Sequence, residues 1–271
     1  MVDWLAKAMT KVAVITPCFN AGGFIGECIA SVEKSVTLGM IEVKHIIVDD
    51  GSTDGTREIL QGMDRPQLKR IFLDNNYGPG YARNAGWQSA GADYIFFLDA
   101  DDVLFANSLR YLVGMAEETG SPWVYGDFVR GDERGRYLVG EDYYGWQFKS
   151  AGAGLYSMYT GRHFFQQNSL YLKRILEEAG GFDSQLAMAE DFDLATRLLL
   201  AGHLPKHVRG PLYMHRYHTQ NLSQEHLADP RHHWKDVANL YRKHCRAFKK
   251  VLSVKQTKEV ERWAELGGLN L

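Results

Sequence analysis

Short apolar runs alternate with helical patterns through the first hundred residues of the chain. Runs rich in Val, Ile, Phe and Leu, which predict strands, cover residues 11–17, 43–48, 68–73 and 94–98. Between successive runs, apolar residues recur at helical spacing, as in residues 82–90. Strands that alternate with helices in this way predict a parallel sheet with right-handed crossovers. The pattern therefore predicts an α/β fold.

Polar residues gather where three of these strands end. Residues 16–20 follow the first run, Asp49–Ser52 the second and Asp99–Asp102 the fourth. Because ligands of parallel α/β sheets bind beyond the carboxyl ends of the strands, we expect the three segments to meet on one rim. The three carboxylates of Asp99–Asp102 repel one another unless a cation lies between them, and Mg²⁺ or Mn²⁺ suits such oxygen ligands. The alternative is a solvated cluster in which Asp102 caps the next helix.

The composition of this rim indicates what it binds. Neither a G-x-G-x-x-G motif nor a G-x-x-x-x-G-K-[ST] motif is present, so no dinucleotide cradle or P-loop is indicated. Asp50 can accept the imide N–H of a uracil, Phe19 can stack on the base, and Arg83 can hold phosphate oxygens as a planar fork. Taken singly, Asp50 also suits a turn and Arg83 a surface ion pair. Taken together on one rim, they favour a nucleoside diphosphate site.

Seven short motifs follow one another at residues 14–20, 47–54, 80–86, 97–102, 180–183, 189–194 and 217–223. In this order and spacing, across about residues 11–223, the chain resembles the family 2 glycosyltransferases, which have the GT-A fold. The resemblance implies a mostly parallel, Rossmann-like nucleotide-binding sheet flanked by helices. It also implies an enzyme that moves a sugar, expected to be a hexose of a UDP-sugar, from a nucleotide-sugar donor to an acceptor hydroxyl.

Matched position by position, the resemblance implies roles for individual residues. The donor site would comprise Thr16, Pro17, Phe19, Asp50, Arg83, Asn84, Asp99 and Ala100. Asp99 and Asp101 would form an Asp-x-Asp motif that, with His218, holds Mn²⁺ or Mg²⁺, and Asp101 is the expected direct ligand.

The resemblance also implies a catalytic pair, Glu190 and Asp191, with Asp191 as the general base. A carboxylate within hydrogen-bond reach can take the proton that the acceptor hydroxyl loses as it attacks. A base on the face opposite the leaving group gives single displacement with inversion, as is usual in the family. Without the resemblance, Asp191 reads as an acid favoured at a helix N-terminus, and His218 as an ordinary surface or core histidine.

Other classes of protein stay open as alternatives. A sugar-1-phosphate nucleotidyltransferase shares this sheet type but needs a basic, glycine-rich loop after the first strand, and residues 17–23 contain no Lys or Arg. A phosphotransferase of the haloacid dehalogenase type needs a nucleophilic Asp in the same place, and none is there. A non-catalytic nucleotide-sugar-binding module would bind donor yet be indifferent to Asp191→Asn. The Gln-x-x-Arg-Trp motif of processive polysaccharide synthases is missing, so we expect transfer of one sugar or a few.

Charge and cysteine content indicate which binding partners and which cellular compartment to expect. The net charge of −2 divides into −8 over residues 1–230 and +6 over residues 231–271. An acidic body is a poor nucleic-acid binder, so we expect a nucleotide-sugar donor and a saccharide or glycoconjugate acceptor as partners, and no nucleic acid. Three widely spaced cysteines indicate free thiols in a reducing compartment. With no apolar stretch of membrane-spanning length, we expect a cytoplasmic protein, peripheral to the membrane at most.

Two regions lie beyond the donor motifs. We expect a GT-A domain over residues 1–228, with a nucleotide-sugar half at about 11–102 and an acceptor half at 103–228, and a basic amphipathic helical extension over 229–271. The helical pattern of residues 231–258 suits an anionic membrane surface or a homodimer contact, but packing on its own domain is favoured. The aromatic-rich residues 123–171 predict either a lid of mobile loops over an acceptor sugar or a core of irregular strands.

Overall fold

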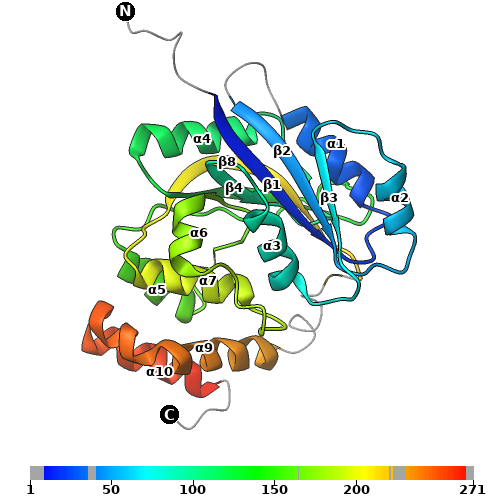
Figure 1. The fold of residues 1–271 in the computed structure, drawn as a ribbon. Coiled ribbons are helices and arrows are strands. Elements are labelled where there is room, and N and C mark those ends of the chain that lie inside the picture. The colour runs from blue at the N-terminus through cyan, green and yellow to red at the C-terminus, as the bar shows by residue number, and fades with distance from the viewer. Residues whose placement is uncertain (1–8, 36–40, 164, 220, 222–229, 267–271) are drawn as a thin grey trace, which may run out of the picture.

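A single twisted sheet forms the centre of the molecule (Figure 1). The structure is a computed structural model that describes residues 9–35, 41–163, 165–219, 221 and 230–266. Over these residues, eight strands lie in the order β3-β2-β1-β4-β7-β6-β8-β5. Their bounds are β1 Thr10–Cys18, β2 Ile41–Asp49, β3 Leu68–Phe72, β4 Tyr94–Phe97, β5 Val103–Leu104, β6 Trp123–Gly131, β7 Leu170–Leu172 and β8 Lys206–Arg216.

The strand directions agree with the predicted class. The strands β3, β2, β1 and β4 are all parallel, and each of the first four apolar runs forms one of them within two residues of the predicted bounds. The short strand β7 runs antiparallel to β4 and β6, β8 is parallel to β6, and β5 is antiparallel to β8. The predicted α/β fold with a mostly parallel sheet is confirmed.

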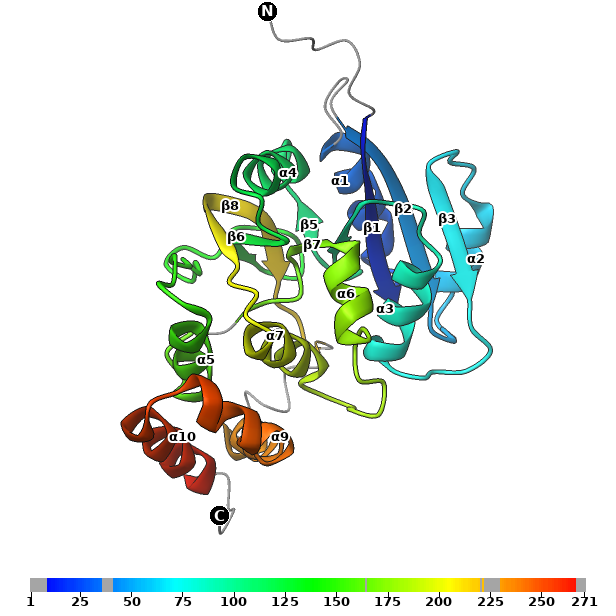
Figure 2. The ribbon, with the colours of Figure 1, turned by 60° about the vertical axis from the view of Figure 1, so that its left-hand side comes forward.

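Helices cover both faces of the sheet (Figures 1 and 2). On one face, α1, α2 and α4 pack over the apolar residues Val12 and Val14 of β1 and their neighbours. On the other face, α3, α5, α6 and α7 pack over Ala13 and Ile15 of the same strand. The bounds are α1 Ile25–Ser35, α2 Thr56–Gly62, α3 Pro79–Gln88, α4 Ser108–Thr119, α5 Ala151–Tyr159, α6 Lys173–Ala179 and α7 Glu190–Leu200.

Two C-terminal helices, α9 (Pro230–Val251) and α10 (Val254–Leu266), form a further layer outside α5 and α7. The apolar residues Val237, Tyr241, Phe248 and Leu252 are buried in the same core cluster as α5 and α7, so the apolar face of α9 packs on its own chain. None of the helices formed by the described residues combines the length and the apolar character needed to cross a bilayer.

The predicted single helical pattern of residues 231–258 is interrupted. The Ser253 hydroxyl accepts a hydrogen bond from the Gln256 backbone N–H (3.3 Å), and the Gln256 side chain accepts one from the Ser253 backbone N–H (3.1 Å). This reciprocal capping box starts α10 as a new helix. Residues 220 and 222–229, which contain part of the last motif and the predicted boundary at 228, lie outside the described residues.

The aromatic-rich residues 123–171 form regular elements, β6, α5 and β7, rather than only loops. Trp123, Tyr125 and Phe165 are buried and lie edge to face or tilted against one another. The core alternative therefore describes most of this region. Three rings depart from it, because Tyr137, Tyr144 and Trp146 are exposed at the surface.

Candidate active site

A buried arginine joins the end of β4 to the start of α7. The Arg83 side chain, 5% exposed, donates from Nη2 to Asp99 Oδ1 (2.9 Å) and from Nη1 to Glu190 Oε1 (2.5 Å). Burial alone would lower the pKa of Arg83, but the charges of Asp99 and Glu190 more than offset it and hold the guanidinium protonated. Arg83 therefore supplies the cation that the carboxylate cluster needs, and it does so between two distant segments of the chain.

Asp191 lies beside this bridge, in the first turn of α7. The residue before the helix, Ala189, has φ 61° and ψ 22°, a left-handed conformation that costs a non-glycine residue on the order of 1–3 kcal/mol. Such strain is concentrated at functional sites. Burial and the charge of Glu190, partly countered by Arg83, raise the pKa of Asp191 to about 7. A carboxyl group with this pKa can accept a proton near neutral pH.

Asp101 pairs with the segment that follows β8. Its Oδ2 lies 2.9 Å from His218 Nε2 and accepts a hydrogen bond from Asn221 Nδ2 (3.0 Å). The His218 ring stacks on Phe24, with ring centroids 4.5 Å apart. The orientation of the imidazole toward Asp101 is therefore fixed from both sides.

Asp102 does not cap a helix. It is buried, accepting hydrogen bonds from Asn168 Nδ2 (3.0 Å) and from the Arg216 backbone N–H (3.1 Å). The next helix begins only at Ser108, after Asn107. The alternative of Asp102 as an N-cap is thus wrong, because residues 103 and 104 extend into β5 instead.

Carboxylates at the end of β2 fix the loops at this edge of the sheet. Asp50 is buried, and its two oxygens accept hydrogen bonds from the backbone N–H groups of Tyr77 (2.9 Å) and Gly78 (2.8 Å). Burial raises the pKa of Asp50, and these two bonds partly counteract the rise. Asp49 accepts from Arg57 Nε (2.7 Å). Asp50 therefore has the turn-stabilising role that was one of the two alternatives from the sequence. Each of its oxygens has a second lone pair that can still accept a hydrogen bond.

The other predicted donor residues divide into two groups. Phe19 is 46% exposed at the rim, Pro17 is partly exposed, and Ala100 is buried. The Thr16 hydroxyl lies inside the protein, 2.8 Å from His45 Nε2, so its side chain does not face the rim. The Asn84 side chain bonds the backbone N–H and C=O of Phe182 (2.9 and 2.8 Å) and ties α3 to the 180–183 segment. The structure thus brings Arg83, Asp99, Glu190 and Asp191 together, and Asp101 with His218, but not the side chains of Thr16 and Asn84.

The model of the family described as Glycosyl transferase family 2 matches residues 13–180. The chain belongs to this family. It is therefore an enzyme of the glycosyltransferase class, and the resemblance seen in its motifs is confirmed.

Relatives and solved structures agree with this assignment. The succinoglycan biosynthesis protein ExoO of Rhizobium meliloti is 27% identical over 209 residues, which are 72% of this chain and 58% of ExoO. The S. aureus protein TarS (residues 1–349), solved in complex with UDP-GlcNAc, is 20% identical with a TM-score of 0.69 over 95% of this chain and 71% of that one. The mannosyltransferase PcManGT of Pyrobaculum calidifontis, solved with GDP-Man and Mn²⁺, is 16% identical with a TM-score of 0.66 over 97% and 74%. These structural likenesses confirm the predicted GT-A fold.

The chain spans 18% of the length of a glycosyltransferase of Rickettsia bellii and 58% of that of ExoO, less than two thirds of either relative.

Three polar residues of this glycosyltransferase were not singled out in its sequence. Gln167 donates from Nε2 to Asp99 Oδ2 (2.5 Å), Asn168 binds Asp102, and Asn221 binds Asp101. Gln167 and Asn168 belong to a polar run, residues 166–169, directly before β7. That run was a visible signal, but nothing in it identifies Asp99 and Asp102 as the partners.

The donor set at Asp101 fits a hard divalent ion only if substrate completes the coordination. The described residues contain no group of three or more His, Cys, Asp or Glu side chains arranged to hold a metal. Asp101 and His218 offer one carboxylate and one imidazole in contact, while Asp99 is engaged by Arg83 and Gln167. Mg²⁺ is commonly held by one or two carboxylates together with substrate phosphates. Asp101 and His218 suit such an arrangement.

Proposed function

We propose that the enzyme transfers a hexose from a UDP-sugar to an acceptor hydroxyl in a metal-dependent reaction, with Asp191 as general base. The observation that carries this proposal is the Arg83 bridge. It fixes Asp99, at the end of a donor-half strand, and Glu190, the neighbour of Asp191, through one guanidinium group. A donor group and a proton acceptor are thereby held in one place, which is what transfer between two substrates requires.

The donor would lie on the rim beyond β1, β2 and β4. Phe19, an exposed ring, would stack on the base beside Pro17, and Asp50 would accept the imide N–H through its remaining lone pairs. Asp99 and Ala100 would lie along the ribose, with Arg83 bordering the diphosphate. The side chains of Thr16 and Asn84 would support this rim from inside, because their hydrogen bonds go to His45 and to Phe182.

Asp101 and His218 would hold Mn²⁺ or Mg²⁺ against the diphosphate, with Asp99 next to them. An ion bound there would offset the charge that develops on the leaving nucleoside diphosphate. Support comes from the contact between these two side chains and from the packing of Phe24 on the imidazole.

Asp191 would take the proton from the acceptor hydroxyl. Its raised pKa and its place at the N-terminus of α7 support this role. Glu190, in contact with Arg83, would keep Asp191 in position. Attack on the side opposite the leaving group would invert the anomeric centre.

The test is release of nucleotide from a panel of UDP- and GDP-sugars with Mn²⁺, with Mg²⁺ and with EDTA, for wild type and Asp101→Ala. We expect slow hydrolysis of one UDP-sugar in the presence of metal. EDTA and Asp101→Ala should each lower it more than a hundredfold. Release that continues in EDTA would contradict the metal site, and absence of both release and metal-dependent UDP binding would contradict the donor site.

A further inference from the structure

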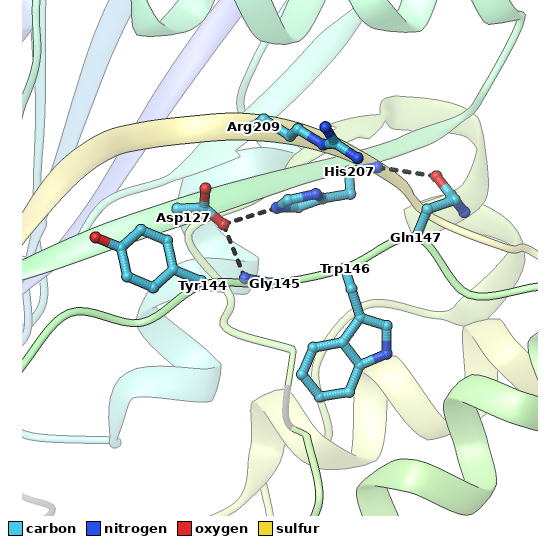
Figure 3. A pocket seen from close by; sticks show the side chains of 7 residues that line it. All are labelled: Asp127, Tyr144, Gly145, Trp146, Gln147, His207 and Arg209. Atoms are coloured by element: carbon cyan, nitrogen blue, oxygen red, sulfur yellow. Dashed lines mark hydrogen bonds and ion pairs between the residues drawn. The ribbon is translucent and has the colours of Figure 1, made fainter.

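A second pocket lies on β6 and β8, apart from the carboxylate cluster (Figure 3). It has a volume of about 370 Å³. Its walls contain two exposed aromatic rings, a guanidinium group and a buried carboxylate–imidazole pair. Pockets that combine aromatic walls with a few fixed polar groups bind organic ligands, and no role described above uses these side chains.

The floor of the pocket is a carboxylate–imidazole pair. Asp127 Oδ1 lies 2.7 Å from His207 Nε2, and each of the two side chains is only 5% exposed. The same carboxylate accepts hydrogen bonds from the backbone N–H groups of Gly145 (2.8 Å) and Gly210 (2.7 Å). Four groups from three segments thus converge at one point, and the polar floor is fixed without a ligand.

A β-bulge places a cation at the rim of this pocket. The register between β6 and β8 shifts on both sides of Asp127, so that Arg209 and Gly210 of β8 have no partner on β6. Gly210 has φ +110°, a conformation that side chains rarely tolerate. Arg209 is exposed, and its guanidinium makes no hydrogen bond or ion pair within the described part of the chain. Bulges of this kind re-aim side chains next to binding sites.

The aromatic walls depend on the close approach of Gly145 to the floor. A Cβ at Gly145 would lie 2.8 Å from the Tyr125 ring and 3.0 Å from His207. With glycine there, the loop passes close to the floor, and Tyr144 and Trp146 lie on either side of Gly145, the Trp146 ring pointing away from Arg209 (Figure 3). Tyr144 is 63% and Trp146 43% exposed. Large rings are left partly uncovered beside a polar floor, as in a stacking site for a ligand with both an apolar face and hydroxyl groups.

The pocket is connected to the reaction centre through the sheet. Val124 of β6 and Phe96 of β4 both pair with Leu170 of β7, so Asp127 and Asp99 each lie three residues beyond the same rung. Two strand spacings separate Phe96 from Val124 on this rung, roughly 10 Å. The segment before β7 also links the two sites, because His163 packs on Trp146 while Gln167 donates to Asp99. A short oligosaccharide can span this distance.

We propose that this pocket binds a sugar unit of the acceptor that lies away from the reacting hydroxyl. The inference rests on the proposed function for the nature of the ligand. Trp146 and Tyr144 would contact the apolar face of the sugar ring, while Arg209 and the edge of the Asp127–His207 pair would bond its hydroxyl groups. The enzyme would therefore select an acceptor of more than one sugar.

The experiment measures retention of the labelled full chain on an array of oligosaccharides of neutral, N-acetylated and uronic sugars. The pocket variants are Trp146→Ala and Arg209→Ala. Matched controls are Tyr111→Ala and Arg110→Ala, both exposed on α4, which covers the opposite face of the sheet. Arg209→Ala removes an unpaired surface side chain, so it tests the pocket without disturbing the packing that Trp146 shares with His163. Thermal unfolding of each variant confirms that it is folded.

We expect wild type and both controls to bind a set of oligosaccharides, and both pocket variants to lose binding at least tenfold. Binding that survives in both pocket variants, or a wild type that binds no oligosaccharide, would overturn the inference. Nucleotide release by the wild type, measured without acceptor, separates the two proposals. Release without saccharide binding would overturn the pocket and keep the proposed function, whereas saccharide binding with neither release nor metal-dependent UDP binding would do the reverse.

Discussion

The two halves of the sheet build the site in different ways. In the donor half, Asp50 is fixed by backbone N–H groups of a loop 27 and 28 residues away, and Asp49 by a side chain only eight residues away. At the end of the donor half, Asp99 and Asp101 instead have partners in the acceptor half, Gln167 and His218, which lie 68 and 117 positions further along the chain.

This difference separates the expected consequences of mutation. A rim held by nearby backbone groups is formed largely within its own half and is suited to binding a constant part of the substrate. Side chains brought from distant segments depend on how the two halves pack. We therefore expect changes in the donor half to act on donor affinity, and changes at the junction of the halves to act on turnover.

The largest effect is expected from Arg83→Met. It leaves the buried Glu190 and the partly exposed Asp99 without their cation, and breaking a buried ion pair such as Arg83–Glu190 costs about 3–5 kcal/mol. We expect this loss in the free energy of unfolding, measured by denaturant titration, and a drop in turnover of more than a hundredfold. Arg57→Met is the matched control, since it breaks an arginine–aspartate pair within the donor half. If turnover by Arg83→Met stays within tenfold of turnover by Arg57→Met, the expectation that Arg83 supports turnover by joining the two halves is contradicted.

A pH profile should distinguish the halves next. Asp191 has a pKa raised to about 7, and a general base must be deprotonated to act. The value of kcat/KM should therefore be highest above pH 7 and fall about tenfold per pH unit below it. UDP binding at the donor half, measured by calorimetry over the same range, should change far less. A turnover profile that is flat between pH 5 and 8 would exclude Asp191 as the base.

A smaller effect is expected from α9. Lys243 Nζ contacts Asp183 Oδ2 (2.7 Å) and Asp193 Oδ1 (2.8 Å), and Asp193 is fully buried two residues after Asp191. Because Lys243 is 39% exposed, solvent screens these pairs, and Lys243→Met should cost about 1 kcal/mol. We expect kcat to fall several-fold with the donor KM unchanged. Lys250→Met, on the exposed side of the same helix, should change neither the free energy of unfolding nor kcat. Equal effects of the two substitutions would contradict a contribution of α9 to turnover.

The smallest effect concerns the start of α10. Ser253→Ala removes the capping hydroxyl and should cost about 1 kcal/mol of unfolding free energy. Turnover should stay within twofold of wild type, because the cap has no contact with either half of the site. A change in turnover of tenfold would show that α10 reaches the reaction in a way that the packing does not reveal.

Sequence patterns predicted the donor half well because its site follows directly from strand ends. Asp50 and Asp99 lie where parallel strands stop, and one rim collects them all. Patterns predicted less where side-chain direction decides. Thr16 lies in the same apolar run that leads to Phe19, yet its side chain points inward to His45. The Asn84 side chain bonds the backbone of another segment, at Phe182.

The acceptor half was predictable only through the resemblance, and even that did not identify Gln167 or Asn221. Their partners lie 68 and 120 residues away, a pairing that depends on the whole sheet being assembled. The β6 strand was missed because Gly126, Asp127 and Arg130 interrupt its apolar run. The break between α9 and α10 depends on the reciprocal cap formed by Ser253 and Gln256. The amphipathic pattern continues across these residues and does not reveal the break.

The most direct test of the account compares donor binding with turnover in Asp191→Asn. This change keeps the shape of the side chain and removes the proton acceptor. We predict that turnover falls on the order of 10²–10⁴-fold, while the Kd for UDP with Mn²⁺ stays within about threefold of wild type by calorimetry. Unchanged turnover would show that the chain transfers sugar without this base. Joint loss of turnover and UDP binding would contradict the separation of donor binding, in the donor half, from proton transfer at Asp191.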